Sequence, residues 1–214
     1  MEGYVRVKGL CKANILRGIS FSIKEKEMVA IMGPSGSGKS TLLYQVSGMD
    51  VPDAGEVWLG DVQIQSLGED EKARLRLKEM GFVFQHMNML ANLNILENIL
   101  LPSVYADKSR SFRNKQQKKA EDLMEKFGIG GLGQRAITEV SGGQLQRACI
   151  CRSMMLDPKI LFADEPTGAL HQAASKEVLD SFLAIHEEGT TILMVTHDSS
   201  IASKCERILY LLDG

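Results

Sequence analysis

The sequence has no long hydrophobic run. No segment approaches the roughly 18 consecutive apolar residues of a membrane span, and the first ten residues, MEGYVRVKGL, contain no apolar signal core. A disulfide framework is excluded because only four scattered cysteines are present, namely Cys11, Cys149, Cys151 and Cys205. We therefore expect a cytosolic protein whose thiols are buried rather than paired.

The sequence also lacks an excess of charge of either sign. Its 25 Lys and Arg residues nearly balance its 27 Asp and Glu residues, for a net charge of -2. A dedicated nucleic-acid binder needs surplus Lys and Arg to hold phosphate backbones, so we expect no nucleic-acid partner. The 214 residues, 44% of them hydrophobic, are enough to bury a core and fit one domain.

Two apolar patterns predict strands of different kinds. Alternating apolar and polar residues predict half-exposed antiparallel strands at residues 5–7, 19–23 and 55–64. Unbroken apolar runs predict strands buried on both faces of a parallel sheet at residues 28–32, 160–163 and 191–195. The predicted fold class is α/β, with a mostly parallel sheet and an antiparallel β part near the N-terminus.

Between residues 85 and 158 the composition becomes helical. In NKQQKKAEDLMEKFG, Leu123, Met124 and Phe127 form an apolar stripe and Gly128 is placed to end the helix. We predict a helical subdomain inserted into the sheet. The basic run at residues 108–119 is interpreted as a solvated helix face, with contact to anionic lipid or a partner as the alternative.

The segment GPSGSGKST fits the pattern G-x-x-x-x-G-K-[ST] between the apolar strand 28–32 and a helix that begins KSTLLYQVSG. Its backbone N–H groups and the helix N-terminus would bind phosphate. Lys39 is expected to reach the β- and γ-phosphates of a nucleotide, and the Ser40 hydroxyl to bind Mg²⁺. The expected nucleotide-binding residues are Gly33, Pro34, Ser35, Gly36, Ser37, Gly38, Lys39, Ser40 and Thr41. A glycine-rich turn is the alternative, which the strand and helix context disfavours.

Three further strand ends carry polar residues suited to phosphate chemistry. In KILFADEPTG, Asp164 is placed to hold the hydration shell of Mg²⁺ and Glu165 to orient or deprotonate the attacking water. His197 follows strand 191–195, and Gln85 ends the strand MGFVFQ. Ligands of an open parallel sheet lie beyond the carboxyl ends of its strands. We therefore expect these side chains in one crevice, with His197 near the γ-phosphate and Gln85 sensing the metal or the water.

The segment ITEVSGGQLQRA predicts a second helix start of unusual composition. Ser141 and Gln144 form an S-x-x-Q capping box. A cap alone does not require Gly142 and Gly143, which cost about 1 kcal/mol each in a helix relative to alanine, whereas amides without side chains allow an anion to approach closely. A well-capped helix and a second phosphate-binding helix end both remain open from these residues alone.

The motifs in order, from the phosphate loop through Gln85, SGGQ and ILFADEPTG to His197, resemble the ATP-binding subunit of an ATP-binding cassette (ABC) transporter. The resemblance covers essentially the whole chain. ADEPTGAL further resembles the subgroup that serves macrolide export, lipoprotein release and antimicrobial-peptide export or resistance. The resemblance implies ATP and Mg²⁺ as cofactors and one ABC ATPase domain over residues 1–214. Residues 1–84 and 159–214 would form its P-loop NTPase core, and residues 85–158 the helical subdomain that carries the signature motif.

The resemblance also implies partners. Two such subunits pair head to tail, so Ser141, Gly142, Gly143 and Gln144 would act in trans on nucleotide held by a second copy or a homologous subunit. An integral membrane permease would contact the chain near residues 85–102 and hold it at the inner face of the cell membrane. The Met and Leu residues of that segment fit the core of the subdomain equally well.

Two departures from the family pattern bear on function. Asn14, or a neighbour, stands where the family usually has an aromatic residue that stacks on adenine, and His171 stands where Asp is most frequent. Our main hypothesis is an ATPase that drives a permease, with Glu165, His197, Lys39 and Gln85 as its catalytic residues. The departures motivate an alternative, a nucleotide-gated switch or sensor subunit with weak hydrolysis.

Overall fold

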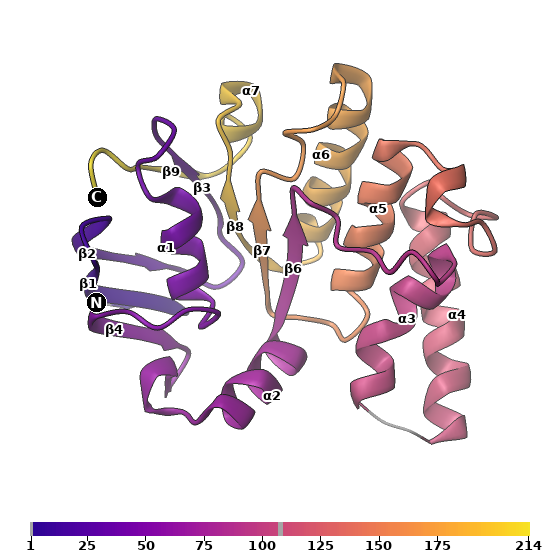
Figure 1. Ribbon diagram of the computed structural model, residues 1–214, viewed down its shortest axis with the longest axis horizontal. Coiled ribbons are helices and arrows are strands. Elements are labelled where there is room, and N and C mark those ends of the chain that lie inside the picture. Colours follow the sequence, from indigo (N-terminus) through magenta and orange to yellow (C-terminus); the bar gives the residue numbers. More distant parts are fainter. Residues whose placement is uncertain (1, 107–108) are drawn as a thin grey trace.

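The fold is built on a five-stranded parallel sheet. The computed structural model describes residues 2–106 and 109–214 and orders these strands β6-β7-β8-β3-β9 (Figure 1). Their bounds are β3 Met28–Met32, β6 Met80–Phe84, β7 Ile160–Asp164, β8 Thr191–Val195 and β9 Arg207–Tyr210. The three unbroken apolar runs of the sequence correspond to the central strands β3, β7 and β8. All side chains of β7 and β8 are buried, as expected for strands covered on both faces.

A second sheet, antiparallel and four-stranded, is formed by the N-terminal part of the chain in the order β2-β1-β4-β5. Its strands are β1 Val5–Lys12, β2 Leu16–Ile23, β4 Ala54–Leu59 and β5 Val62–Gln63. The segment 55–64, predicted as one strand, is instead a hairpin that turns at Gly60 and Asp61 and ends in a 3₁₀ turn, Ile64–Ser66. Gly60 has a φ of +55°, a value that few other residues adopt easily and that reverses the chain.

The helices divide between the sheets and a helical insert, as predicted. Helices α1 Lys39–Val46, α2 Glu69–Glu79, α6 Gln172–Glu187 and α7 Ser199–Ala202 accompany the strands, and the insert holds α3 Ile95–Ala106, α4 Arg110–Lys126, a 3₁₀ turn at Ile137–Glu139 and α5 Gly142–Ser153. The stripe of α4 is confirmed, because Met124 and the C-cap Phe127 are buried, Leu123 is half-buried against the same core, and Gly128 follows with a φ of +67°. Lys115 and Lys118 of the basic run are exposed on α4, whereas Lys108 lies outside the described residues.

Two hydrophobic cores cover the faces of the parallel sheet. On β7, Leu161 and Ala163 face a core shared with α3 to α6, while Ile160 and Phe162 face a core shared with α1 and the antiparallel sheet. Within the described residues, every helix is too short or too polar to cross a bilayer. The polar residues that follow β3, β6, β7 and β8 are therefore anchored by buried strands, and all lie where the parallel strands have their carboxyl ends.

Candidate functional site

The phosphate loop joins β3 to α1 as its sequence predicts. Gly36 has a φ of +80°, and an added Cβ there would meet no atom within 4 Å, so its side-chain position faces open space. Gly33, in contrast, has no room for a side chain, because a Cβ there would lie 2.2 Å from the carbonyl oxygen of Leu211. Lys39 is buried and folds back across the loop, where its Nζ donates a hydrogen bond to Pro34 O at 2.8 Å. The loop thus surrounds an ammonium group and opens on one side, an arrangement suited to a polyphosphate.

Asp164 ends β7 directly beside the start of α1. Ser40 Oγ donates to its Oδ1 at 2.9 Å, and the hydroxyl of Tyr44 donates to its Oδ2 at 3.0 Å. Burial raises the pKa of the Tyr44 hydroxyl, and the negative charge and hydrogen bond of Asp164 raise it further. Tyr44 is not among the site residues predicted from the sequence, although its position four residues after Ser40 puts both hydroxyls on one face of α1.

Ser40 and Asp164 offer the hard oxygen atoms that Mg²⁺ prefers. Mg²⁺ usually takes one or two carboxylates or hydroxyls from the protein and completes its octahedral shell with water and substrate phosphate. Across residues 2–106 and 109–214, no group of three or more His, Cys, Asp and Glu side chains is placed to hold a metal ion. The donors present therefore fit Mg²⁺ that arrives with a nucleotide, and they do not form a self-sufficient metal cage.

Glu165 follows Asp164 and directs its carboxylate to a different neighbour. Its Oε2 lies 3.0 Å from His197 Nδ1, so the carboxyl ends of β7 and β8 are joined by this pair. Glu165 has a φ of +45°, which is rare for a residue other than glycine. Two backbone bonds hold this conformation, from Glu165 N to Val195 O at 3.0 Å and from Gly168 N to Glu165 O at 3.1 Å. A strained backbone held in this way is typical of functional residues.

Gln85 lies close to Glu165, and both side chains pack beside Gly168. A Cβ on Gly168 would lie 3.1 Å from Gln85 Nε2 and 3.2 Å from Glu165 Oε2, so both groups pack against this bare position. Gln85 also lines a pocket of about 540 Å³ together with Tyr44 and Asp164. The four predicted strand-end residues, Gln85, Asp164, Glu165 and His197, thus gather at one edge of the sheet.

The start of α5 is a capping box, as predicted. Gln144 N donates to Ser141 Oγ at 3.3 Å, and Ser141 N donates to Gln144 Oε1 at 2.9 Å. A Cβ on Gly143 would lie 2.8 Å from the Cβ of Ala174, so this glycine also allows α5 to pack closely on α6. In Figure 1 the start of α5 lies well apart from the phosphate loop, with β7 and β6 between them. Ser141 to Gln144 therefore do not complete the site of their own chain.

One face of α5 holds the backbone at the end of β6 and in the loop that follows it. Gln146 Nε2 donates to Phe84 O at 3.2 Å, and Cys149 Sγ donates to Met87 O at 3.2 Å. Arg152 donates to Met87 O at 2.9 Å and to Asn88 O at 2.8 Å. These side chains recur every three residues along the helix, so they share one face. The segment that contains Gln85 is thereby fastened to the helix that begins with SGGQ.

The two departures from the family pattern have distinct settings. Asn14 lies exposed in the turn between β1 and β2, and the next residue, Ile15, contacts the phosphate loop, since a Cβ on Gly38 would lie 2.8 Å from Ile15 Cγ2. His171 is the N-cap of α6, where its Nδ1 accepts a hydrogen bond from Ala174 N at 3.4 Å. His171 therefore performs a capping role that Asp also performs well.

Comparison with known proteins decides the family. The profile of the ABC transporter family matches residues 16–168. This chain belongs to the ABC transporter family. It is 42% identical over 200 residues to the lipoprotein-releasing system ATP-binding protein LolD of Aquifex aeolicus, a match that covers 94% of this chain and 88% of LolD. The resemblance found in the sequence is confirmed, and as an ABC cassette the chain is an ATPase that binds and hydrolyses ATP.

Other relatives extend this result. The macrolide export ATP-binding/permease protein MacB of Bdellovibrio bacteriovorus is 39% identical over 206 residues, which are 96% of this chain and 31% of MacB. The chain thus spans about a third of the length of the MacB proteins that it matches. The dimeric structure of the ATP-binding cassette MJ0796 bound to ADP and Pi is 34% identical, with a TM-score of 0.87 over 98% of this chain and 95% of that one. The cassette fold predicted from the sequence is therefore confirmed.

Proposed function

We propose that this ABC ATPase pairs head to tail with a second copy or a homologous subunit around two MgATP and drives a separate membrane permease. The observation that carries the proposal is the separation of the two phosphate-binding helix ends. The loop of α1 lies with Asp164 and Glu165, whereas the capped start of α5 lies elsewhere on the molecule (Figure 1). A partner chain would supply the missing end. The dimeric structures of the related cassette MJ0796 support this arrangement.

Within each site we assign the roles as follows. The backbone N–H groups of residues 33–41 and Lys39 bind the phosphates and offset the charge that develops in the transition state. Ser40 and Asp164, with Gln85, would hold Mg²⁺, which would supply positive charge to neutralise the phosphate oxygens. Glu165 accepts the proton of the attacking water, and His197, 3.0 Å from Glu165 Oε2, orients that carboxylate.

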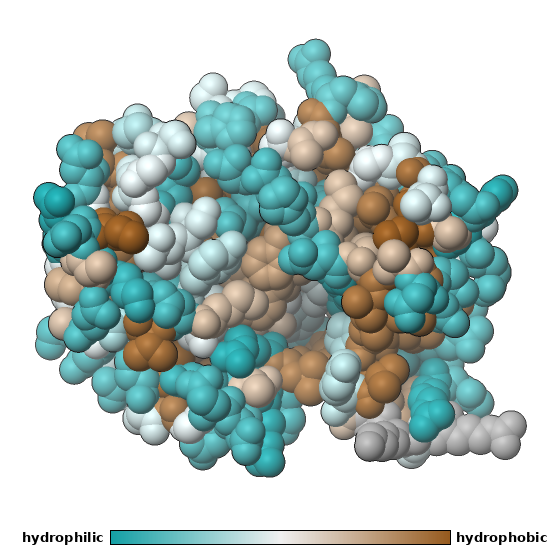
Figure 2. Space-filling view, viewed as in Figure 1, coloured by the Kyte–Doolittle hydropathy of each residue, from teal (hydrophilic) through white to brown (hydrophobic). Residues whose placement is uncertain are grey.

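The permease would dock in an apolar groove of about 440 Å³ between α2 and α3. Its walls include Leu77, Phe82 and Phe84 on one side and Leu101, Pro102 and Tyr105 on the other. Figure 2 shows a hollow with apolar residues beside it in this part of the surface. Segment 85–102 could serve as subdomain core or as permease contact, and its residues differ in this respect. Ile95 and Ile99 are buried in the core, whereas Leu101 and Pro102 line the groove.

This docking would place the chain at the inner face of the cell membrane, with residues 85–158 acting as the helical subdomain of a single ATPase domain. The roles for which LolD and MacB are named, lipoprotein release and macrolide export, support an export or lipoprotein-release system. The alternative of a switch with weak hydrolysis loses part of its motivation, since His171 caps α6 and its replacement of Asp preserves that function. Steady-state turnover of the chain with its permease separates the two.

The pairing is tested by light scattering after size exclusion on Glu165→Gln, with and without MgATP. Removing the general base should lower hydrolysis by at least about 100-fold while nucleotide binding persists. The variant should therefore shift from monomer to dimer with MgATP. Adding Ser141→Arg should abolish the shift, because a bulky cation would occupy the contact with the partner's nucleotide. Nucleotide-bound protein that stays monomeric would contradict pairing through the SGGQ end, and undiminished turnover would contradict the role of Glu165.

A further inference from the structure

Tyr44 holds the oxygen of Asp164 that Ser40 does not. Ser40 Oγ and the Tyr44 hydroxyl donate to different oxygens of the same carboxylate, at 2.9 Å and 3.0 Å. Both donors come from α1, and the carboxylate comes from β7. The orientation of Asp164 is therefore fixed from one helix by two hydrogen bonds. A single bond would leave the carboxylate free to rotate about its remaining side-chain torsions.

The ring of Tyr44 contacts Phe84, the residue immediately before Gln85. The two ring centroids are 6.3 Å apart, with planes at 64°, the edge-to-face geometry that aromatic pairs favour. Phe84 is supported in turn by Phe82, 5.9 Å away in a stacked arrangement. Phe84 lines both the apolar groove and the pocket around Asp164. Phe84 is thus shared between the wall of the proposed permease groove and the pocket that Asp164 lines.

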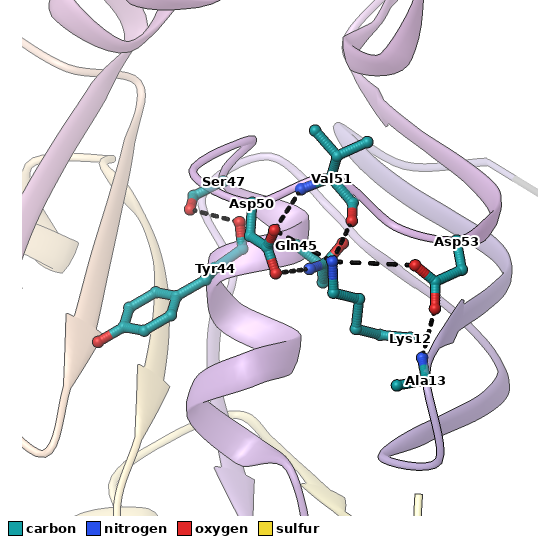
Figure 3. A network of polar contacts seen from close by, with 8 residues as sticks. All are labelled: Lys12, Ala13, Tyr44, Gln45, Ser47, Asp50, Val51 and Asp53. Atoms are coloured by element: carbon teal, nitrogen blue, oxygen red, sulfur yellow. Dashed lines mark hydrogen bonds and ion pairs between the residues drawn. The ribbon is translucent and has the colours of Figure 1, made fainter.

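The turn of α1 that bears Tyr44 is firmly anchored. Lys12 Nζ donates to Asp50 Oδ1 at 3.1 Å and to Val51 O at 2.6 Å, and Gln45 Nε2 donates to Asp50 Oδ2 at 2.5 Å (Figure 3). The Tyr44 side chain points away from this network in Figure 3, so it takes no part in it beyond its backbone carbonyl. With its backbone held in this way, Tyr44 can transmit a displacement of Phe84 to Asp164.

We propose that Tyr44 is a positioning residue that fixes Asp164 for Mg²⁺, and that its contact with Phe84 makes this position responsive to what fills the apolar groove. The proposal rests on the proposed roles of Asp164 and of the groove. The Ser40 hydroxyl can donate its hydrogen bond to Asp164 while a lone pair of the same oxygen binds the metal ion. Tyr44 fixes the orientation of the Asp164 carboxylate that accepts this bond, and does not itself bind metal or nucleotide.

The test measures how strongly Mg²⁺ tightens nucleotide binding. The dissociation constant of a fluorescent non-hydrolysable ATP analogue is determined for the full chain in excess Mg²⁺ and in EDTA, and the ratio of the two is compared between variants. Tyr44→Phe should lower the ratio by about tenfold, equivalent to about 1.4 kcal/mol, and leave the EDTA value unchanged because the phosphate loop is intact. Tyr4→Phe, which removes the hydroxyl of a tyrosine packed in the core beside the antiparallel sheet, is the matched control and should leave both values unchanged.

The ring contact is tested by Phe84→Leu and by the double variant with Tyr44→Phe. Phe84→Leu should lower the same ratio, and the double variant should lose no more than Tyr44→Phe alone, because both changes act through one hydroxyl. Additive losses would overturn the link through Phe84. Phe84→Met, which conserves volume, replaces Phe84→Leu if the latter fails to fold.

The outcomes also separate this inference from the proposed function. If Mg²⁺ fails to tighten binding to the unmodified chain, the roles of Ser40 and Asp164 are wrong. If Mg²⁺ tightens binding to the unmodified chain and to Tyr44→Phe equally, those roles stand and the positioning role of Tyr44 is wrong.

Discussion

His171 illustrates how a departure from a family pattern can keep a local structural role. Its imidazole is exposed and accepts a hydrogen bond from Ala174 N at 3.4 Å, which is longer than a typical N–H···O bond. The same position in a helix favours Asp, whose carboxylate accepts the bond and also interacts favourably with the helix dipole. The side chain at this position therefore sets part of the stability of α6.

We expect His171→Asp to raise the free energy of unfolding by about 0.5–1 kcal/mol at neutral pH, because a carboxylate that also interacts favourably with the helix dipole replaces a long hydrogen bond. His171→Ala should lower it by a similar amount, since Ala cannot accept the hydrogen bond. Urea unfolding monitored by circular dichroism checks both. Equal stability of the Ala variant and the unmodified chain would show that the imidazole contributes no cap.

At the scale of elements, the contact between α5 and α6 separates two reasons for the adjacent glycines. A Cβ on Gly143 would lie 2.8 Å from Ala174 Cβ, whereas one on Gly142 would lie 3.3 Å from Leu170 Cδ2, the flexible end of a side chain. Packing therefore requires glycine at residue 143. At residue 142 packing tolerates a methyl group once the Leu170 side chain shifts by a few tenths of an ångström, so packing alone does not require glycine there.

Gly143→Ala should destabilise the chain by about 1 kcal/mol. The overpacking of α5 against α6 costs about 1–3 kcal/mol, partly offset by the better helix propensity of Ala, about 1 kcal/mol. Gly142→Ala should leave stability unchanged or slightly raised. Urea unfolding measures both, and the same MgATP-induced dimerisation assay measures the ligand role, which Gly142→Ala should impair. A stable Gly143→Ala would mean that α5 shifts without cost.

The elements that could be predicted from the sequence are those whose local residue pattern already shows which faces are covered or where a helix begins. The unbroken apolar runs of β3 and β8 specify strands covered on both faces, and Ser141 with Gln144 specifies the start of α5. Contacts between distant segments could not be predicted in this way. The bond from Tyr44 to Asp164 joins residues 120 positions apart, and the packing of Gly143 on Ala174 depends on the relative placement of two helices. The hairpin at residues 54–63 was not predicted, because the alternation of apolar and polar residues resumes after Gly60 and Asp61 and so resembles one continuous strand.

At the scale of the whole molecule, the cluster around Lys12 links the antiparallel sheet to the loop that follows α1. Lys12 lies between Asp50, at 3.1 Å, and Asp53, at 3.9 Å (Figure 3). Partial burial acts to raise the pKa of Asp50, but hydrogen bonds from Lys12, Val51 N and Gln45, together with the charge of Lys12, outweigh it and hold that pKa below its ordinary value. Folding therefore favours the ionised form of Asp50.

This contribution to stability is complete above the ordinary pKa of 3.8 and is lost as pH falls through the lowered pKa of the folded state. We expect Asp50→Asn to be less stable than the unmodified chain at pH 7, with a difference that narrows in acid below about pH 4. Urea unfolding at several pH values between 7 and 3 checks this. Asp122→Asn, on an exposed position of α4, is the matched control. A difference that stays constant over this range would exclude ionisation of Asp50 as its source.

The fastening of residues 84–88 to α5 gives that helix the mechanics of a lever. Its 12 residues span about 18 Å at the rise of an α-helix, with Arg152 bonded to the loop near one end and Ser141 at the other. If the loop at Met87 and Asn88 is pushed, a tilt of only about 5° moves the Ser141 end by about 1.5 Å. A misplacement of about 1 Å is enough to slow a reaction about 100-fold. A small shift beside the groove would thereby be amplified at the Ser141 end of α5, which we propose contacts a partner's nucleotide.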